Sequence, residues 1–327
     1  MRALVAEKPG GAETLRFKEL PVPVPGPGEV RIRVQRCGLN PLDVAARRGD
    51  APWFVTRWPA ILGIEFSGTV DRIGEGVEAS WVGELVTSTT TMGGNADYAV
   101  APVSGICRAP AGIDADTAAL YRGASHTAFR ILEMYGPARD TGAWVLVHSA
   151  AGTIGPILTQ LAKAGGASVI GITSTQAKAD WAAQFGADHL VVATGDEWVS
   201  PVRDILGDDG VALAVDGNGG EGAVRNVEVL APFGTAVFIG ASSGVQAPAI
   251  APRQLIPKAL RIAGFALPLV EALRGDVQRV DELIVGQLKS GALKMPIARL
   301  ADFSDLPALH TAFEARELIG RTLIRLD

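Results

Sequence analysis

Three small residues with a fixed spacing lie where a strongly apolar segment meets a helix-like one. Ala150, Gly152 and Gly155 follow the run AWVLV (143–147) and precede ILTQLAKAG. This is the spacing of a dinucleotide-binding turn with alanine at its first glycine. The turn leaves the backbone bare at Gly152 and allows close helix packing at Gly155, while the helix N–H groups can bind a diphosphate. It predicts a dinucleotide site made by Ala150, Ala151, Gly152, Thr153, Ile154 and Gly155.

The end of the next predicted strand indicates which dinucleotide is bound. An NAD site usually has Asp or Glu about 20 residues after the glycines. Here the chain reads GITSTQAK (171–178), with Ser174 and Lys178 and no acidic residue. Hydroxyl groups and a lysine suit a 2′-phosphate, which a carboxylate would repel. We therefore expect NADPH; the alternative is that Lys178 is only a solvated residue on a helix face.

Two polar residues in the first third of the chain need an explanation. Glu65 lies inside the apolar run PAILGIEFSG (59–68), where an unpaired buried carboxylate would cost several kcal/mol. It should therefore have a partner, and a general-base role is the less favoured alternative. Asn40, in CGLNPLD (37–43), precedes a proline and is expected to cap a short helix.

The elements that carry these residues fall into three regimes. Residues 1–119 are strand-like and rich in turns, since LRFKEL and EVRIRVQR alternate polar and apolar residues. Over 120–265, strand and helix alternate six times, which is typical of a Rossmann-type, doubly wound parallel sheet in an α/β protein. Residues 266–327 contain two helices and two strands, and we expect these strands to return to the first domain.

Composition excludes several functional classes. The 327 residues are 48% hydrophobic with a net charge of −5, which gives no reason to expect nucleic acid or an anionic membrane as a partner. Two cysteines are too few for a disulfide framework and fit a reducing cytoplasm. No apolar run approaches the length of about 18 residues that a membrane span needs.

With these motifs in hand, the chain resembles the zinc-free quinone oxidoreductase branch of the medium-chain dehydrogenase/reductase superfamily. The motifs are CGLNPLD, GIEFSGTVDRIGEGV (63–77), HSAAGTIG (148–155), FGADHLV (185–191) and GRTLIRL (320–326). The resemblance implies a GroES-like β-rich catalytic domain, 1–119 and 266–327, around a Rossmann NADPH-binding domain, 120–265.

The resemblance also implies roles for single residues. Asn40 would lie beside the nicotinamide as the catalytic residue, and Arg321 would pair with Glu65 and reach the cofactor diphosphate. The wall of the nicotinamide site would come from FIGASSG (238–244) and GFAL (264–267), although FIGASSG could also be an ordinary strand-turn. The further cofactor-binding residues that we expect are Thr127, Ile239, Gly240, Ala241, Phe265 and Leu267.

No metal is expected, because the ligand positions of the zinc-dependent relatives are changed. Asn40, Ile64 and, approximately, Gly123 stand at those positions. The segment TSTTTMGGNADYAV (87–100) replaces the four-cysteine loop of the structural zinc site.

The substrate pocket departs from the pattern of many quinone reductases, which have a tyrosine where this chain has Ala45. Tyr98, Tyr121 and His126 are candidates for another acid, although each is more often structural. Aromatic residues of APWFVTRWP (51–59) either shape the acceptor pocket or pack the open end of the barrel, with no preference between the two; they are Trp53, Phe54 and Trp58.

These features predict an NADPH-dependent, metal-independent reductase that acts on a quinone or on the C=C bond of an α,β-unsaturated carbonyl. The alternative is an NADPH-binding protein with a structural, sensing or regulatory role and little turnover, which the change at Ala45 favours. The strand GTAVFIG (234–240) is expected at the sheet edge, where it would support a homodimer.

Overall fold

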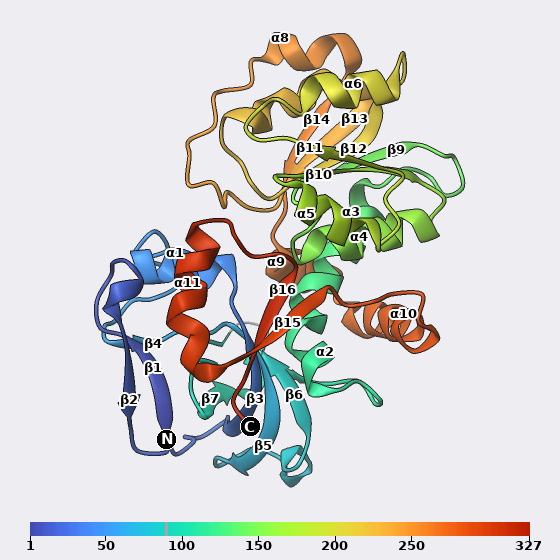
Figure 1. Ribbon diagram of the computed structural model, residues 1–327. Helices are drawn as coiled ribbons and strands as arrows, with labels where there is room; N and C mark the ends of the chain where they lie inside the picture. The colour runs from blue at the N-terminus through green and yellow to red at the C-terminus, as the bar shows by residue number, and fades with distance from the viewer. Residues whose placement is uncertain (89–90) are drawn as a thin grey trace. The chain divides into compact units, whose positions relative to one another are not determined.

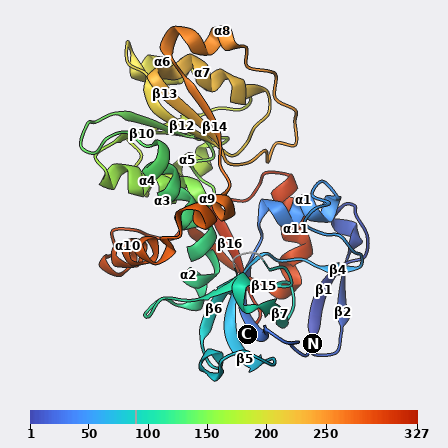
Figure 2. The ribbon, with the colours of Figure 1, turned by 180° about the vertical axis from the view of Figure 1, so that it is seen from behind.

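The computed structural model describes residues 1–88 and 91–327, which divide into two compact units (Figure 1). The first unit comprises Met1–Gly123 and Ile297–Asp327, and the second comprises Ala124–Pro296. The expected boundaries were 119 and 265. The second boundary lies later in the structure because α9 (Leu267–Arg274) and α10 (Val277–Ser290) contact α3 (His126–Tyr135) of the second unit (Figure 2).

The second unit is built on a six-stranded parallel sheet, as predicted. Its strand order is β11-β10-β9-β12-β13-β14, the order of a Rossmann fold. The chain order reverses beside β9, so the carboxyl end of β9 is where a dinucleotide is expected. The strands are β9 (Trp144–Val147), β10 (Ser168–Thr173), β11 (His189–Val192), β12 (Val211–Asp216), β13 (Leu230–Phe238) and β14 (Arg261–Gly264).

Two expectations for this unit are wrong. GTAVFIG forms most of β13, which pairs with both β12 and β14, so the edge strand is β14. Residues 266–327 were expected to contain two helices, but the segment 269–291 is divided into α9 and α10 because Gly275 is left-handed, with a φ of 67°. The remaining helices of the unit are α4 (Ile154–Ala164), α5 (Gln176–Ala183), α6 (Val199–Leu206), α7 (Asn226–Val229) and α8 (Pro252–Leu255).

The first unit joins the two ends of the chain in one β-rich structure, as predicted. Strand β16 (Arg321–Arg325) runs antiparallel to β3 (Glu29–Gly38) and parallel to β15 (Ile297–Asp302). The larger sheet has the order β15-β16-β3-β5-β6-β8, with β7 also paired to β3, and a smaller sheet has the order β2-β1-β4. The other strands are β1 (Arg2–Ala6), β2 (Leu15–Glu19), β4 (Ala60–Ile61), β5 (Glu65–Ile73), β6 (Leu85–Ser88), β7 (Tyr98–Pro102) and β8 (Ile106–Arg108).

Three helices complete the first unit: α1 (Pro41–Arg48), α2 (Ala115–Leu120) and α11 (Leu306–Glu314). The segment 114–135, expected as one helix, begins at the Asp114 cap but contains a π-helical turn, Tyr121–Ser125, between α2 and α3. Across the described residues, every helix is too short or too polar to cross a membrane.

Candidate functional site

The turn between β9 and α4 has the geometry that a bound diphosphate needs. Ser149 is left-handed, with a φ of 53°, and its carbonyl accepts a hydrogen bond from Gly152 N at 2.8 Å. A Cβ atom at Gly155 would lie 2.6 Å from the Ser149 carbonyl oxygen, so only glycine fits there. The Thr153 side chain makes no capping hydrogen bond to α4. The first N–H groups of this helix are therefore available to an anion.

The alanine at the first position of the turn is matched by a glycine on the neighbouring strand. Ala150 is buried against Gly171 of β10. A Cβ atom at Gly171 would lie 2.7 Å from Ala150 Cβ and 2.8 Å from Leu190 Cδ2. The methyl group of Ala150 therefore fits because β10 has no side chain at that point, and the turn stays intact.

Lys178 and Ser174 come together at the carboxyl end of β10. Lys178 Nζ donates a hydrogen bond to Ser174 Oγ at 3.1 Å. Thr175 caps α5 by accepting a hydrogen bond from Lys178 N at 3.3 Å, which fixes the first turn of the helix. Asp180, the next acidic residue, accepts a hydrogen bond from Gln176. An ammonium group beside a hydroxyl group suits a phosphate oxygen.

A pocket of about 600 Å³ lies at the carboxyl ends of β13 and β14. Its apolar lining suits a flat ring, and Leu267, another expected contact, begins α9 beside it. Ile239 was expected to bind the cofactor. Its N–H already donates to the Asp216 carbonyl at 2.9 Å, so this donor is not available to the carboxamide of a nicotinamide. Ala241 lies just beyond the pocket in an exposed turn, and Thr127 is buried on α3. The lining residues are Phe238, Ile239, Gly240, Gly264, Phe265, Ala266, Leu269 and Val270.

A buried polar network beside the turn was missed by the sequence analysis. Asn226 Nδ2 donates to Asp216 Oδ2 at 3.1 Å, and Asn226 Oδ1 lies 2.9 Å from His148 Nε2. Ser149 Oγ donates to Asn218 Oδ1 at 2.6 Å, while the Asn218 N–H donates to Asp216. These bonds tie the loop after β12 to the loop after β9. The sequence signal for this loop is the glycine-rich stretch GNGG (217–220), which directly follows the buried strand β12.

In the first unit, Asn40 caps α1 and is held at both ends of its amide. Its Oδ1 accepts a hydrogen bond from Leu42 N at 2.8 Å, and its Nδ2 donates to Glu65 Oε1 at 2.7 Å. Asp43 Oδ2 accepts from Asn40 N at 3.0 Å and completes a capping box. Among the described residues, these bonds leave one N–H of the Asn40 amide without a partner, and the bond to Glu65 fixes its direction.

Asp43 is a functional residue that the sequence analysis treated only as part of a motif. It is buried, and its Oδ1 accepts hydrogen bonds from Gly63 N and Ile64 N at 3.0 and 3.1 Å. Burial raises the pKa of Asp43 to about 6, against the lowering effect of its backbone hydrogen bonds and of the Arg321 charge. The carboxylate joins the start of α1 to the segment before β5 and thereby fixes Asn40 relative to Glu65.

The predicted pairing of Glu65 with Arg321 is confirmed. The Arg321 guanidinium donates to Glu65 and to the Leu39 carbonyl. Desolvation lowers the pKa of Arg321 to about 10, which leaves it a cation at neutral pH. Both oxygens of Glu65 therefore have partners, one in Asn40 and one in Arg321. This arrangement supports the structural role over that of a general base.

Asn40 and Gly123, at two of the zinc-ligand positions, both adjoin the Glu65 carboxylate. A Cβ atom at Gly123 would lie 3.3 Å from Glu65 Oε1. Neither these residues nor Ile64 supplies a metal ligand. Among the described residues, no group of three or more His, Cys, Asp or Glu side chains is placed to hold a metal ion. Residues 89–90, part of the segment that replaces the structural zinc loop, lie outside the described residues.

The three candidate acids have structural environments. The Tyr98 ring lies under the Arg31 guanidinium, with 5.2 Å from its carbon to the ring centroid. Tyr121 is buried. Both ring nitrogens of His126 contact carboxylates.

The aromatic residues of the loop 51–59 divide into two groups. Phe54 and Trp58 pack against the core of the first unit, which supports the packing alternative for both. The Trp53 side chain is 75% exposed.

Comparison with known proteins places the chain in a family. A family model of the alcohol dehydrogenase GroES-like domain matches residues 26–121, and one of zinc-binding dehydrogenases matches 153–285. A 2-haloacrylate reductase from a Burkholderia species is 30% identical over 329 residues, and the match covers 98% of each chain. The chain is a medium-chain dehydrogenase/reductase. It belongs to the zinc-free quinone oxidoreductase branch.

Solved structures of medium-chain reductases share the fold over the whole chain. Quinone oxidoreductase of Escherichia coli complexed with NADPH is 25% identical with a TM-score of 0.90, and the match covers 99% of this chain and 100% of that one. A mycobacterial protein complexed with NADPH is 29% identical with a TM-score of 0.89, and the match covers 99% of each chain. Although the second family model is named for zinc, it matches residues 153–285, which contain none of the expected ligand positions Asn40, Ile64 and, approximately, Gly123.

Proposed function

We propose that this chain is an NADPH-dependent, metal-independent reductase that transfers hydride to a quinone or to the C=C bond of an α,β-unsaturated carbonyl. The observation that carries the proposal is the Lys178–Ser174 pair beyond an intact phosphate turn. The names of its relatives, a 2-haloacrylate reductase and quinone oxidoreductases, support the acceptor class, because those acceptors all contain an electron-poor conjugated system.

The residues of the second unit fit NADPH at three points. The bare turn at Gly152 and Gly155 suits the diphosphate, since a Cβ atom at Gly155 would fill the cradle. Lys178 and Ser174 suit the 2′-phosphate, and the pocket beside α9 suits the nicotinamide. From the first unit, Arg321 has a buried Nε–H with no hydrogen-bond partner among the described residues. The proposed cofactor-binding residues are Asn40, Thr127, Ala150, Ala151, Gly152, Thr153, Ile154, Gly155, Ser174, Lys178, Ile239, Gly240, Ala241, Phe265, Leu267 and Arg321.

The chain itself contributes two things to the reaction: it orients the cofactor and the acceptor, and it holds the Asn40 amide N–H in a fixed direction. NADPH supplies the hydride when bound. Glu65 and the Leu42 N–H hold the Asn40 amide, so its remaining N–H can donate to an acceptor oxygen on which negative charge develops. A conjugated acceptor spreads that charge, so one preorganised donor is sufficient. A simple ketone would need a stronger acid or a metal ion.

An acceptor panel tests this function. With NADPH, the loss of absorbance should be rapid with quinones and enones and slow with simple ketones. With NADP⁺ and ethanol, the reverse assay, the absorbance should rise slowly. Tight NADPH binding without turnover of any acceptor would instead favour the alternative of an NADPH-binding protein with a sensing or structural role.

Substitution of Lys178 tests the cofactor assignment. Lys178→Ala should weaken NADPH binding by about 1–3 kcal/mol, as expected for a charge-assisted bond, and leave NADH binding unchanged. The exposed Lys289, on α10, provides the control, because Lys289→Ala should change neither affinity. Fluorescence titration measures both affinities. If Lys178→Ala loses the same affinity for NADPH and for NADH, Lys178 does not contact the 2′-phosphate.

We also propose a homodimer and a cytoplasmic location. Strand β14 is the edge of the parallel sheet, and Ile262 on it is exposed. An uncovered edge strand favours pairing with a second copy about a two-fold axis. The cytoplasmic location rests on the two cysteines, which are too few for a disulfide framework.

A further inference from the structure

Helix α9 forms part of a pocket wall although none of its residues is buried. Leu269 and Val270 line the pocket at the carboxyl ends of β13 and β14. The Leu269 and Leu273 side chains are 73% and 87% exposed. An eight-residue helix is not stable by itself, and α9 has little of the apolar burial that normally fixes a surface helix, since its Leu267 and Val270 are only half-buried. Polar contacts are therefore needed to hold α9 in place.

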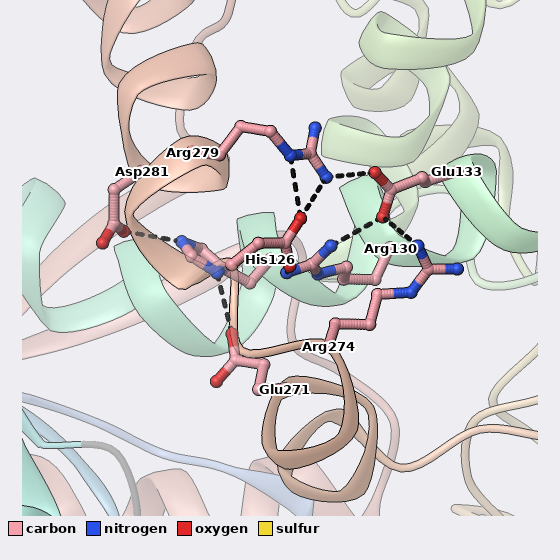
Figure 3. Close-up of polar contacts among 8 residues, drawn as sticks. His126, Arg130, Glu133, Glu271, Arg274, Arg279 and Asp281 are labelled. Carbon is pink, nitrogen blue, oxygen red and sulfur yellow. Dashed lines mark hydrogen bonds and ion pairs between the residues drawn. The ribbon is translucent and has the colours of Figure 1, made fainter.

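His126, at the start of α3, supplies such contacts (Figure 3). Its Nδ1 lies 2.8 Å from Glu271 Oε1 on α9, and its Nε2 lies 2.8 Å from Asp281 Oδ1 on α10. The ring is fully buried. Two carboxylate contacts require hydrogens on both ring nitrogens or a proton on one carboxyl group. In either form at least one bond joins the ring to an ionised carboxylate and is charge-assisted, and the ring itself is shielded from solvent.

The same face of α3 carries two further charged residues that hold the turn between α9 and α10. Arg130 is fully buried and donates to Glu133 on α3 and to Asp276 in the turn. Arg279 on α10 also donates to both carboxylates. Figure 3 shows these side chains together with Arg274, whose nitrogen lies 3.7 Å from Glu133. The cluster clamps the α9–α10 pair onto α3 by ion pairs.

Glu271 directly follows Val270, so its bond to His126 fixes α9 next to the pocket wall. We propose that His126 is a positioning residue for the reaction, because it sets the place of α9 and thereby the shape of the pocket that holds the nicotinamide and the acceptor. This inference rests on the proposed function. It replaces the role of proton donor that the sequence analysis considered for His126.

Replacing His126 by leucine tests the proposal. His126→Leu fills the space of the ring with an apolar side chain and removes the bonds to Glu271 and Asp281. The kcat for a quinone or an enone should fall about tenfold or more, because small displacements of reacting groups cost that much. The dissociation constant of NADPH should stay within about threefold of wild type, because the charged phosphate contacts at the turn and Lys178 are unaffected. A residue with only a structural role would lower the melting temperature without separating kcat from affinity.

A second measurement follows α9 directly and needs no turnover. Amide hydrogen exchange over 267–274 and tryptic cleavage after Arg274 should both be faster in His126→Leu. Glu271→Gln should also make exchange and cleavage faster. It provides the same test of the proposal if His126→Leu does not fold. Glu282→Gln is the matched control, because Glu282 is exposed beside Asp281 on α10, and it should leave exchange and kcat unchanged.

Two results would overturn the proposal. One is unchanged exchange over 267–274 in both variants, and the other is faster exchange with an unchanged kcat. A wild-type protein that turns over no acceptor would contradict the proposed function instead, and the exchange data would then still decide whether His126 holds α9.

Discussion

The Asn40 amide joins two tasks, since it caps a helix with its oxygen and faces Glu65 with its nitrogen. The capping bond uses a backbone N–H that would otherwise be unpaired, so it costs the amide only one of its acceptor sites. The bond to Glu65 fixes the direction of the nitrogen, and Arg321 is the cationic partner of Glu65. A change at any of the three residues should therefore affect the other two.

Glu65→Gln should lower the free energy of unfolding. The neutral amide leaves Arg321 buried without its carboxylate, and breaking a buried pair typically costs about 3–5 kcal/mol. Urea denaturation measures the change. The control is Asp302→Asn, which breaks the exposed pair with Arg325, whose side chains are 69% and 49% exposed. That pair should contribute less than about 1 kcal/mol, so equal losses in the two variants would contradict a buried Glu65–Arg321 pair.

His310 should make the protein sensitive to acid. It is buried in α11, and burial together with the charge of Arg47 lowers its pKa to about 3. The unfolded chain has an ordinary histidine pKa of about 6.5, so between these values only the unfolded state binds the proton and stability falls as the pH falls. Between pH 7 and 5, wild type should lose about 2 kcal/mol more than His310→Leu. Parallel pH profiles of urea denaturation for the two proteins would contradict this assignment.

The sequence predicts those residues whose chemistry can be recognised from their neighbours along the chain. The pairing of Glu65 is confirmed, and the role of Lys178 stays a prediction. Lys178 follows the phosphate turn at a known distance, and the lone Glu65 in an apolar run required a partner. Asp43 and Asn226 were not found, because their partners are backbone and buried groups far away along the chain. Burial of a polar side chain is a property of the fold and has no local signature.

At the scale of elements, the phosphate turn depends on the strand beside it. Ala150 replaces the first glycine of the pattern, and the space for its methyl group comes from Gly171 on β10. Periodicity predicted both elements correctly but could not show that one compensates for the other. The order of the strands was also hidden, so the expected edge strand was wrong: β13 is covered by β14.

Gly171→Ala should destabilise the protein and weaken NADPH binding. The new methyl group would lie 2.7 Å from Ala150 Cβ and 2.8 Å from Leu190 Cδ2, and overpacking of this kind costs about 1–3 kcal/mol. Adding Ala150→Gly should restore part of both losses, because it removes one of the two clashes. Urea denaturation measures the loss of stability, and NADPH titration measures the loss of affinity.

A glycine-to-alanine control is available on α10. Gly286 lies in the helix α10, and a Cβ atom added there would have no heavy atom within 4 Å. Gly286→Ala should therefore stabilise the protein by about 0.5–1 kcal/mol. A stabilising effect of Gly171→Ala would refute the compensation between Gly171 and Ala150.

At the scale of the whole molecule, the parallel sheet ends in an apolar edge. Ile262 is exposed on β14, Phe233 is exposed on β13, and Ile256 is exposed shortly before β14 in the chain. Apolar residues beside an open strand edge favour pairing between copies. The proposed homodimer is the simplest closed assembly in which two copies cover each other's β14 edge; β11 is the other edge of each sheet.

Ile262→Lys should convert the proposed dimer to a monomer, because a lysine on an edge strand opposes pairing. Light scattering at micromolar concentration should give twice the mass of one chain for wild type and one chain for the variant. Leu300→Lys is the control, since Leu300 is 40% exposed on β15 and Ile262 is 37% exposed. A monomeric wild type at that concentration would refute the dimer.

The position of β16 has a consequence for how the protein is made. The second unit is continuous, so all of its residues are synthesised before β16. The first unit is not, because β16 lies between β15 and β3 and carries the counter-ion of Glu65. During translation the N-terminal strands therefore wait, with β3 lacking one neighbour and Glu65 uncompensated, while the later unit can fold. The first unit, which begins first in the chain, is therefore the last that can be completed, and it is the unit that holds Asn40 in place.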